Sequence, residues 1–333
     1  MISAAKDGAC ACWVRNTVDE ALDAYLRLKE QFESEEGLQE DNVLLFHARF
    51  AMGDRLEIEQ RVLDQFGKFS DKENRKGKIL IATQVVEQSL DLDFDLLVTD
   101  LAPMDLIFQR VGRQHRHQNR NRPANYKEPR CIVLTPFPSL ECNRDWYSGF
   151  FRKAAYVYPN HGQLWRTARF LYQNPLLRFP EDSRTALESV YGDIAIDLPS
   201  ELEAQAMQAE GESLAQSDMA LWNALKLDEG YKMSQSQWIE DTISPTRLGE
   251  PTVTFRLGYF SNGNIVPWYH ADNLGKSWGL SEVRIMAYRL SDSSPPESEE
   301  EKTSREKAVE EMPDKSKFSV LLPMIQTGQY IWT

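Results

Sequence analysis

Residues 79–91 read Ile-Leu-Ile-Ala-Thr-Gln-Val-Val-Glu-Gln-Ser-Leu-Asp, and this stretch decides the fold that we expect. Its first four residues form an apolar run of the length of a buried strand. Polar side chains follow at once, and open α/β sheets bind their ligands just beyond the C-terminal ends of their strands. The stretch therefore predicts a buried strand that leads into a binding loop carrying Thr83, Gln84, Glu87, Ser89 and Asp91.

Strand and helix patterns alternate through the first 140 residues, which indicates a parallel sheet with helices on both faces. Thr17 to Glu20 read as a capping box, and the apolar stripe of the helix that it opens runs to Phe32. A second helix is expected near residues 56–66. Together with 79–82, the expected strands are residues 9–14, 43–46, 96–101 and 131–136, and the whole set predicts one parallel α/β lobe.

Residues 109–116 read Gln-Arg-Val-Gly-Arg-Gln-His-Arg and carry a regular spacing of polar groups. A continuous helix would present Gln109, Gly112, Arg113 and Arg116 on one face, because they recur at i, i+3, i+4 and i+7. Arginine offers a rigid fork of donors to phosphate oxygens, as arginine fingers do in nucleotide hydrolysis. The face predicts a phosphate contact; the alternative is a helix surface whose charges pair with neighbouring acids.

Residues 82–91 and 109–117, taken together, resemble helicase motifs V and VI of superfamily 2, in the form found in the CRISPR-associated helicase-nuclease of type I-E interference systems. The resemblance covers essentially the whole chain but only the C-terminal part of the family's architecture. That part comprises the second RecA-like lobe, a linker and a C-terminal domain. The family's HD nuclease domain and first lobe would precede it, and this sequence contains no His-Asp dipeptide.

The resemblance implies an ATP site shared between two lobes. Arg113 and Arg116 would be the arginine fingers, and Gln109 would lie near the γ-phosphate. Asp91 and Gly112 would couple nucleotide contacts to the rest of the lobe. ATP and Mg²⁺ would be held mainly by the missing first lobe, and we expect neither a tightly bound cofactor nor a metal ligand in this chain alone.

The resemblance also implies contacts with single-stranded DNA. Thr83 and Gln84 would touch its backbone, because hydroxyl and amide groups bond phosphate oxygens without reading sequence. His47, Arg49 and Arg55 resemble a family segment that contacts the same strand. His47 is equally compatible with a packed loop histidine, and Arg55 with an ion pair at helical spacing.

Two short patterns imitate the parts of a motor that this chain lacks. Gly275-Lys276-Ser277 resembles the end of a phosphate-binding loop, but His270 stands where the loop needs its earlier glycine. Residues 228–231 imitate an acidic box but follow a helical pattern instead of a strand. Alone, the chain should therefore not hydrolyse ATP.

Composition bounds the remaining possibilities. The chain has 333 residues, a formal net charge of -13 and no apolar run near the ~20 residues of a membrane span, so we expect a cytoplasmic protein without a secretory signal or membrane contact. Against this acidic background, residues 110–130 form a basic segment that we interpret as functional. We expect Cys10, Cys12, Cys131 and Cys142 to be small buried residues. A zinc site or a disulfide is the less favoured alternative.

Changes in composition and residue pattern along the chain suggest three regions. We expect the RecA-like lobe with a helical extension over residues 1–198, one or two linker helices over 199–242, and a small C-terminal domain with β structure over 243–333. Residues 291–317, rich in Ser, Pro, Glu and Lys, are expected to be a mobile acidic insertion. The aromatic residues Trp238, Trp268 and Trp278 are interpreted as core residues in preference to base-stacking ones.

These observations favour the C-terminal portion of an ATP-dependent single-stranded-DNA translocase and nuclease of antiviral defence. An RNA-guided surveillance complex would recruit the complete motor. The alternative is a regulator or competitive inhibitor that docks on that complex or on the helicase partner. A superfamily 2 helicase unrelated to CRISPR is a third possibility.

Overall fold

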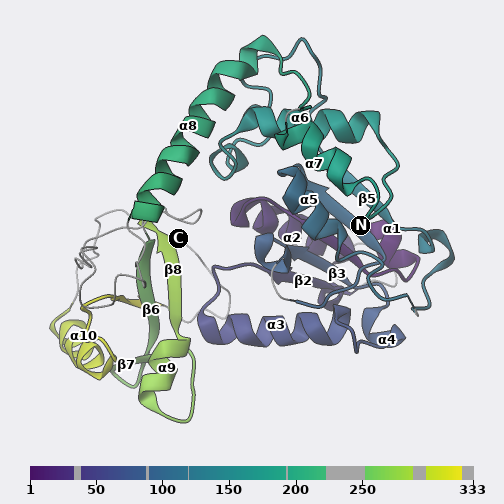
Figure 1. The fold of residues 1–333 in the computed structure, drawn as a ribbon. Helices are drawn as coiled ribbons and strands as arrows, with labels where there is room; N and C mark the ends of the chain where they lie inside the picture. Colours follow the sequence, from purple (N-terminus) through teal and green to yellow (C-terminus); the bar gives the residue numbers. More distant parts are fainter. Residues whose placement is uncertain are drawn as a thin grey trace, which may run out of the picture. The chain divides into compact units, whose positions relative to one another are not determined.

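The computed structural model describes residues 1–33, 39–87, 90–118, 120–192, 194–222, 252–287 and 298–324. The chain divides into two compact units (Figure 1). The N-terminal unit comprises Met1–Leu45 and Leu63–Gly249, and the C-terminal unit comprises Phe46–Val62 and Glu250–Thr333. Among the described residues, no helix has the length and apolar character that crossing a membrane requires.

A five-stranded sheet forms the centre of the N-terminal unit, in the order β2-β3-β1-β4-β5. The pairs β1–β3, β1–β4 and β4–β5 are parallel, with Ala11 opposite both Ile79 and Leu96. All five expected strands are present, which confirms the predicted α/β fold. Their bounds are β1 Ala11–Val14, β2 Val43–Phe46, β3 Ile79–Ala82, β4 Leu96–Asp100 and β5 Arg130–Leu134.

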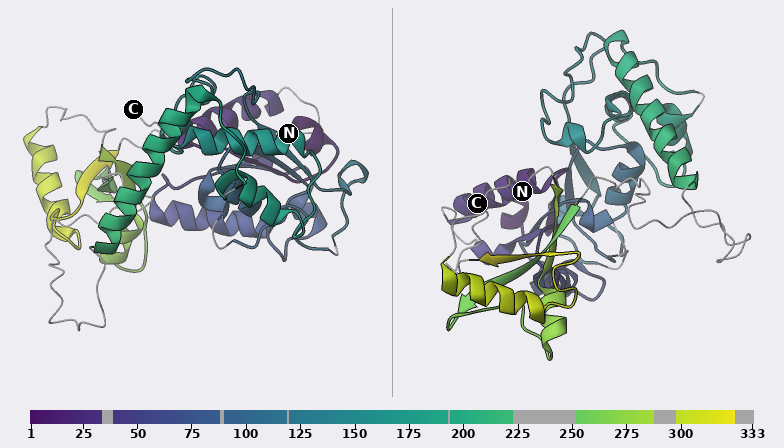
Figure 2. Two further views of the ribbon diagram at one scale, coloured as in Figure 1. Left: turned by 45° about the horizontal axis from the view of Figure 1, so that its top comes forward. Right: turned by 90° about the vertical axis from the view of Figure 1, so that its left-hand side faces the viewer.

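Helices cover both faces of this sheet (Figure 2). On one face, α1 and α2 bury apolar residues such as Ala21 and Phe32 against Ile79 and Ile81. On the other face, Arg110 of α5 bonds the side chain of Thr99 in β4. The helices of this unit are α1 Ile2–Lys6, α2 Val18–Glu33, α4 Lys72–Arg75 and α5 Met104–Val111, and most of α3 Met52–Phe66 belongs to the C-terminal unit.

Three further helices follow the last strand. They are α6 His161–Gln173, α7 Ser183–Tyr191 and α8 Ser200–Trp222. Leu202 and Ala206, near the start of α8, are buried, and a side chain at Gly162 of α6 would come within 2.8 Å of Ala206. The expected linker therefore begins as one unbroken helix packed on α6. Its remainder, with residues 228–231, lies outside the described residues.

The C-terminal unit contains a small sheet in which β6 is central. It pairs antiparallel with β7 and β8 along its length and parallel with β9. A tight turn joins β6 to β7, with Asn262 and Gly263 at φ 50° and 76°. The elements are β6 Thr252–Ser261, β7 Asn264–Pro267, α9 Leu274–Leu280, β8 Glu282–Met286, α10 Glu299–Glu311 and β9 Val320–Met324.

Helix α10 corrects the expectation of a mobile loop over residues 291–317. A complete capping box between Ser298 and Glu301 begins the helix. Ala308 and Met312, one helical turn apart, are buried in a cluster with Trp278. Composition hid this pattern because only a few positions of an otherwise charged helix face the core. Residues 291–297 lie outside the described residues.

The first turn of α3 packs against the C-terminal sheet within the C-terminal unit. Trp268 donates a hydrogen bond of 2.9 Å from Nε1 to Asp54, and Tyr269 donates one of 2.6 Å to Glu57. Trp268 is partly buried in this cluster and Trp278 is fully buried, so both are packed residues as expected. Trp238 lies outside the described residues.

Gly53 allows this close approach, and replacing it should weaken the C-terminal unit. A Cβ atom at Gly53 would collide with the ring of Tyr269. We expect Gly53→Ala to lower the free energy of unfolding by about 1–3 kcal/mol, because overpacking outweighs the gain in helix propensity. The matched control is Gly211→Ala in α8, where no atom lies within 4 Å of the new Cβ and a gain of up to ~1 kcal/mol is expected. Urea unfolding of both variants checks this; equal effects would contradict it.

Candidate functional site

A fully buried arginine organises the C-terminal ends of the parallel strands. Arg110 of α5 is 0% exposed and donates to the Glu87 carboxylate at 2.7 Å and to the Thr99 hydroxyl at 2.7 Å. The same guanidinium bonds Asn16 Oδ1 at 3.2 Å and the hydroxyl of Tyr158 at 3.1 Å. Segments that follow β1, β3 and β4 are thus joined to α5 by one side chain.

The structural role of Arg110 was not predicted from the sequence, in which it stands only as one member of the basic segment. A signal was available. Leu106 and Ile107, at i−4 and i−3 on the same helix, are both core residues. An arginine on that face must bury its charge, and buried charges need paired acids and further hydrogen bonds.

The helix that carries Arg110 ends earlier than the spacing of Gln109 to Arg116 predicts. Helix α5 ends at Val111, with Gly112 as its C-cap, so the expected continuous helical face is wrong. The chain instead turns to pair with Phe94: the N–H of Phe94 donates to the Arg113 carbonyl at 2.9 Å, and that of His115 donates to the Phe94 carbonyl at 3.2 Å. His115 adopts φ 49° at this turn. Pairing with a distant strand end therefore overrides helical periodicity.

The two predicted arginine fingers nevertheless contact the segment after β3. Arg113 donates to the carbonyl oxygens of Val86 at 3.1 Å and Glu87 at 2.9 Å. Arg116 forms a 2.8 Å ion pair with Asp91, and the two side chains are 42% and 43% exposed. The structure thus brings Asp91, Arg113 and Arg116 together.

Gln109 and Gly112 lie on the exposed surface beside these arginines. A Cβ at Gly112 would meet only backbone oxygens of its own helix, at 3.3 Å and 3.5 Å. No packed side chain of the described residues therefore explains this glycine. Ser89 lies outside the described residues.

The charges around Arg113 suit a phosphate group. Partial burial lowers the pKa of Arg113, the neighbouring Arg116 lowers it further, and Asp91 opposes the change. A half-buried cation held near a second cation is electrostatically unfavourable, and an anion placed between them would relieve both costs. The arrangement can therefore accept phosphate oxygens as bidentate hydrogen-bond acceptors.

The predicted DNA-contacting residues differ in accessibility. In the N-terminal unit, Thr83 is only 3% exposed, whereas Gln84 is partly exposed and donates from Nε2 to the Asn16 carbonyl at 2.8 Å. In the C-terminal unit, Arg49 and Arg55 are partly exposed. A DNA strand can thus contact Gln84, Arg49 and Arg55 directly. The Thr83 hydroxyl cannot contact DNA without movement.

His47 is a packed histidine. It is 2% exposed, its Nδ1 accepts a 3.0 Å hydrogen bond from the backbone N–H of Arg49, and its ring stacks on Phe50 at 4.1 Å. Its expected contact with DNA is therefore corrected in favour of the alternative. The physical reason is that the turn after β2 directs the ring inward, where its Nδ1 closes the turn.

Because His47 is buried, its titration should make the protein sensitive to acid. Burial and then the charge of Arg49 lower its pKa from 6.5 to about 4. Between these two pH values His47 is protonated in the unfolded chain but neutral in the folded chain. The free energy of unfolding therefore falls as pH decreases from 6.5 to about 4, and above pH 6.5 the contribution of His47 is constant. The loss is at most about 3 kcal/mol. Urea unfolding against pH should show a shallower slope for His47→Gln; an unchanged slope would contradict this.

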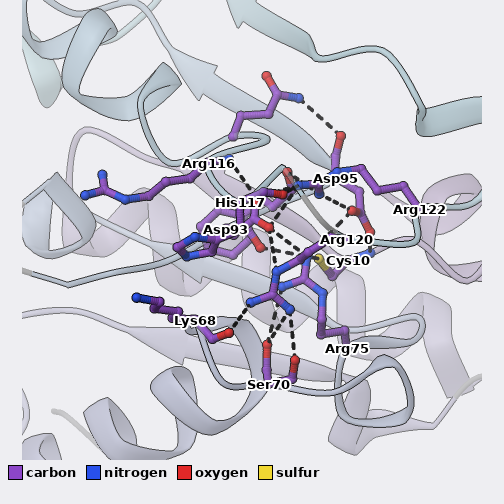
Figure 3. Close-up of polar contacts among 12 residues, drawn as sticks. Cys10, Lys68, Ser70, Arg75, Asp93, Asp95, Arg116, His117, Arg120 and Arg122 are labelled. Atoms are coloured by element: carbon purple, nitrogen blue, oxygen red, sulfur yellow. Dashed lines mark hydrogen bonds and ion pairs between the residues drawn. The ribbon is translucent and has the colours of Figure 1, made fainter.

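Much of the basic segment is neutralised internally (Figure 3). Asp93, which is 0% exposed, pairs with Arg120 at 2.8 Å and with Arg122 at 2.9 Å. Arg75 of α4 lies 3.6 Å from Asp95, which also binds Arg122. The interpretation of the whole segment as a functional basic surface is therefore corrected: Arg110, Arg120 and Arg122 support the fold, and only part of the segment faces outward.

The four cysteines are free. Cys10 and Cys12 are fully buried on β1 or beside it, as expected for small core residues. Burial raises the pKa of Cys10 to about 12, which keeps the thiol protonated near neutral pH.

Comparison with known proteins adds independent information. Residues 7–119 match the family described as "CRISPR-associated nuclease/helicase Cas3, C-terminal". The CRISPR-associated endonuclease/helicase Cas3 of Escherichia coli strain K12 is 37% identical over 252 residues, which are 75% of this chain and 26% of that protein. Cas3 of Thermus thermophilus is 37% identical over 244 residues, covering 65% of this chain and 25% of that protein. The chain thus spans about a quarter of the length of these curated relatives.

Solved structures agree with these sequence matches. Cas3 of T. fusca, crystallised with AMPPNP, has a TM-score of 0.73 and 28% identity, and the match covers 99% of this chain and 37% of that one. A chain of a CRISPR RNA-guided surveillance complex before nicking has a TM-score of 0.65 and 28% identity, covering 96% of this chain and 38% of that one.

Proposed function

Because this chain belongs to the Cas3 family of CRISPR-associated helicase-nucleases, whose C-terminal part it matches, we propose that it supplies motifs V and VI to an ATP site completed by the family's first RecA-like lobe. The single observation that carries the proposal is the cluster of Arg113, Arg116 and Asp91 beside the ends of the parallel strands. It supports an ATP site because Arg113 bonds backbone carbonyls and Arg116 pairs with a partly exposed carboxylate, so that both guanidiniums can turn to a phosphate.

In this proposal Arg113 and Arg116 stabilise charge on the transferring phosphoryl group. Phosphoryl transfer needs little covalent chemistry from a protein and depends on positioning and on electrostatic stabilisation. Arg113 would exchange its hydrogen bonds to the carbonyls of Val86 and Glu87 for phosphate oxygens. Arg116 would also donate to phosphate oxygens, and its retained pair with Asp91 would link that movement to the segment after β3. Gln109 and Gly112 face the side from which the other lobe would approach, and that lobe would hold Mg²⁺.

The same cycle would move single-stranded DNA. Gln84 follows Thr83 at the end of β3, and the Glu87 carbonyl that accepts from Arg113 belongs to the same short helical turn, Gln84–Glu87. A change at the phosphate site would therefore be transmitted to a group that can bond the DNA backbone. Arg49 and Arg55 of the C-terminal unit would add sequence-independent contacts. The displaced strand would be fed to the family's nuclease domain.

The proposed setting is type I-E CRISPR interference, in which an RNA-guided surveillance complex recruits the motor. The residue pattern of the two motifs supports this subtype. The fold match to a chain of a surveillance complex supports the partner.

ATP turnover measured on single-stranded DNA tests the proposal. The chain alone should be inactive, and activity should appear when a separately expressed fragment with the nuclease and first lobe is added, because each half contributes part of the phosphate site. Appreciable DNA-stimulated turnover by the chain alone would contradict the shared site. Binding of the two halves without turnover would instead favour the regulator or inhibitor.

A further inference from the structure

A second basic surface lies at the N-terminal edge of the parallel sheet. Asp7 and Gly8 precede β1, Asp95 precedes β4, and Pro123 lies before β5; all four line a hollow of about 440 Å³. In a parallel sheet these positions mark the N-terminal edge, whereas Thr83 and Asp100 mark the C-terminal edge. The hollow is not lined by Arg113, Arg116 or Asp91, although the backbone N–H of Arg116 donates to Asp93 beneath it at 2.9 Å.

The hollow carries an excess of positive charge. Its cationic side chains are Lys72, Arg75, Lys76, Arg120 and Arg122, and its acidic ones are Asp7 and Asp95. Adding the buried Asp93 beneath them still leaves five cations against three acids. The excess is local, because the chain as a whole has a formal net charge of -13. An anion is the ligand that such a surface favours.

The arginines form the floor of the hollow, and the lysines can bind an anion. Arg75, Arg120 and Arg122 side chains are 8%, 12% and 7% exposed and are held by Asp93 and Asp95. Lys72 and Lys76, one helical turn apart, are exposed at the rim. A phosphate group could therefore bond two mobile ammonium groups above a fixed positive base.

An aromatic side chain stands beside this hollow. Phe69 is 94% exposed and immediately precedes Ser70, which lines the hollow. The loop that carries it is anchored from below: Arg120 donates to the carbonyls of Gly67 at 2.6 Å, Lys68 at 2.9 Å and Ser70 at 2.9 Å (Figure 3). Arg120 is itself held by Asp93. The backbone of this loop is thus held in place, and its aromatic ring is exposed.

A basic hollow next to an exposed ring is the combination that binds single strands. Cationic groups follow the backbone, and bases stack on aromatic faces with little dependence on sequence. Double-stranded DNA keeps its bases stacked on one another, so the ring has no base to receive. Lys68, whose ammonium group lies over the Phe69 ring at 5.8 Å from its centroid, adds positive charge near the ring.

We propose that this N-terminal edge is a second contact for single-stranded DNA, with a backbone phosphate between Lys72 and Lys76 and a base on Phe69. The choice of DNA as the strand rests on the proposed function, but the residues of the site do not overlap with those of motifs V and VI. This edge would bind the DNA strand independently of the nucleotide cycle. It would therefore reduce dissociation of the DNA from the motor.

Fluorescence anisotropy with the full chain and a labelled thymidine oligonucleotide of about 15 residues tests the inference. Phe69→Ala should weaken binding about tenfold through lost stacking. Lys72→Ala with Lys76→Ala should also weaken it and should reduce the dependence of log affinity on log salt by ~0.7, because the two lysines share one backbone phosphate. A duplex of the same length should bind more weakly than the single strand.

Two control variants separate this site from other effects. Lys302→Ala with Lys307→Ala removes the same charge from the exposed side of α10 and should leave affinity and salt dependence unchanged. Gln84→Ala alters the proposed motif V contact at the other edge. Loss of binding in the Gln84 variant alone would overturn the second site while supporting the proposed function. Loss in the Phe69 and lysine variants alone would support the second site, whatever the ATP measurement shows. Absence of binding by the unmodified chain would overturn the second site and leave the ATP test to decide the proposed function.

Discussion

Arg113→Ala should lower DNA-stimulated ATP turnover of the mixed halves by about 10³- to 10⁵-fold, the range for loss of an arginine finger. The expected cause is the loss of a guanidinium that stabilises charge only in the transition state. In the structure Arg113 occupies its donors with the carbonyls of Val86 and Glu87, so it is already placed beside the segment that it would couple to the nucleotide. Steady-state turnover at saturating ATP and DNA measures the effect.

Two comparisons separate a catalytic role of Arg113 from a merely structural one. Arg113→Lys keeps the charge but loses the planar fork, so it should recover only a small part of the activity. The free energy of unfolding of Arg113→Ala should fall by no more than about 1–2 kcal/mol, because only carbonyl contacts are lost. A variant that loses stability and activity in proportion would show that Arg113 acts through the fold, and full activity of Arg113→Ala would exclude it as a finger.

Arg110→Met should lower the free energy of unfolding of the N-terminal unit by about 3–5 kcal/mol. The substitution removes one partner of a buried ion pair and leaves the Glu87 carboxylate, whose side chain is 6% exposed, without its cation. The Thr99 hydroxyl and the Tyr158 hydroxyl lose a donor at the same time. Urea unfolding followed by amide hydrogen exchange of α5 and β4 measures the loss.

A second substitution tests the reason for that loss. If the cost comes from the unpaired carboxylate, Arg110→Met combined with Glu87→Met should recover much of the stability, because apolar groups of similar volume can replace a buried pair at little cost. Tyr158→Phe removes a single hydrogen bond to Arg110 and should cost only about 1 kcal/mol. A stable Arg110→Met protein would show that the arginine does not organise the strand ends.

The sequence predicted the sheet well because strands of this kind are encoded locally. The strands at 79–82 and 96–100 are buried along their whole length, and the apolar runs 79–82 and 96–98 indicate an interior strand without reference to any partner. The capping residues of α2 also acted as expected: Thr17 accepts a hydrogen bond from the Glu20 N–H at 3.2 Å. In each case the decisive residues lie within one turn or one strand.

The site was predicted less completely because periodicity does not reveal where a helix must stop. The spacing from Gln109 to Arg116 satisfies a helical face, yet the pairing of Phe94 with residues 113–115 ends the helix at Val111. Similarly, a charged composition concealed the two core positions of α10, Ala308 and Met312. Both errors arose where a contact with a distant segment outweighed a local preference.

By itself, the amino-acid sequence determined the parallel α/β sheet and the polar segment that follows β3, because each depends on residues close together in the chain. Only the tertiary structure decided which arginines are accessible. Arg110 meets Asn16, 94 positions away, and Arg122 meets Asp93, 29 positions away. A charge is buried or exposed according to whether such a partner reaches it, and that is decided when the strand ends meet.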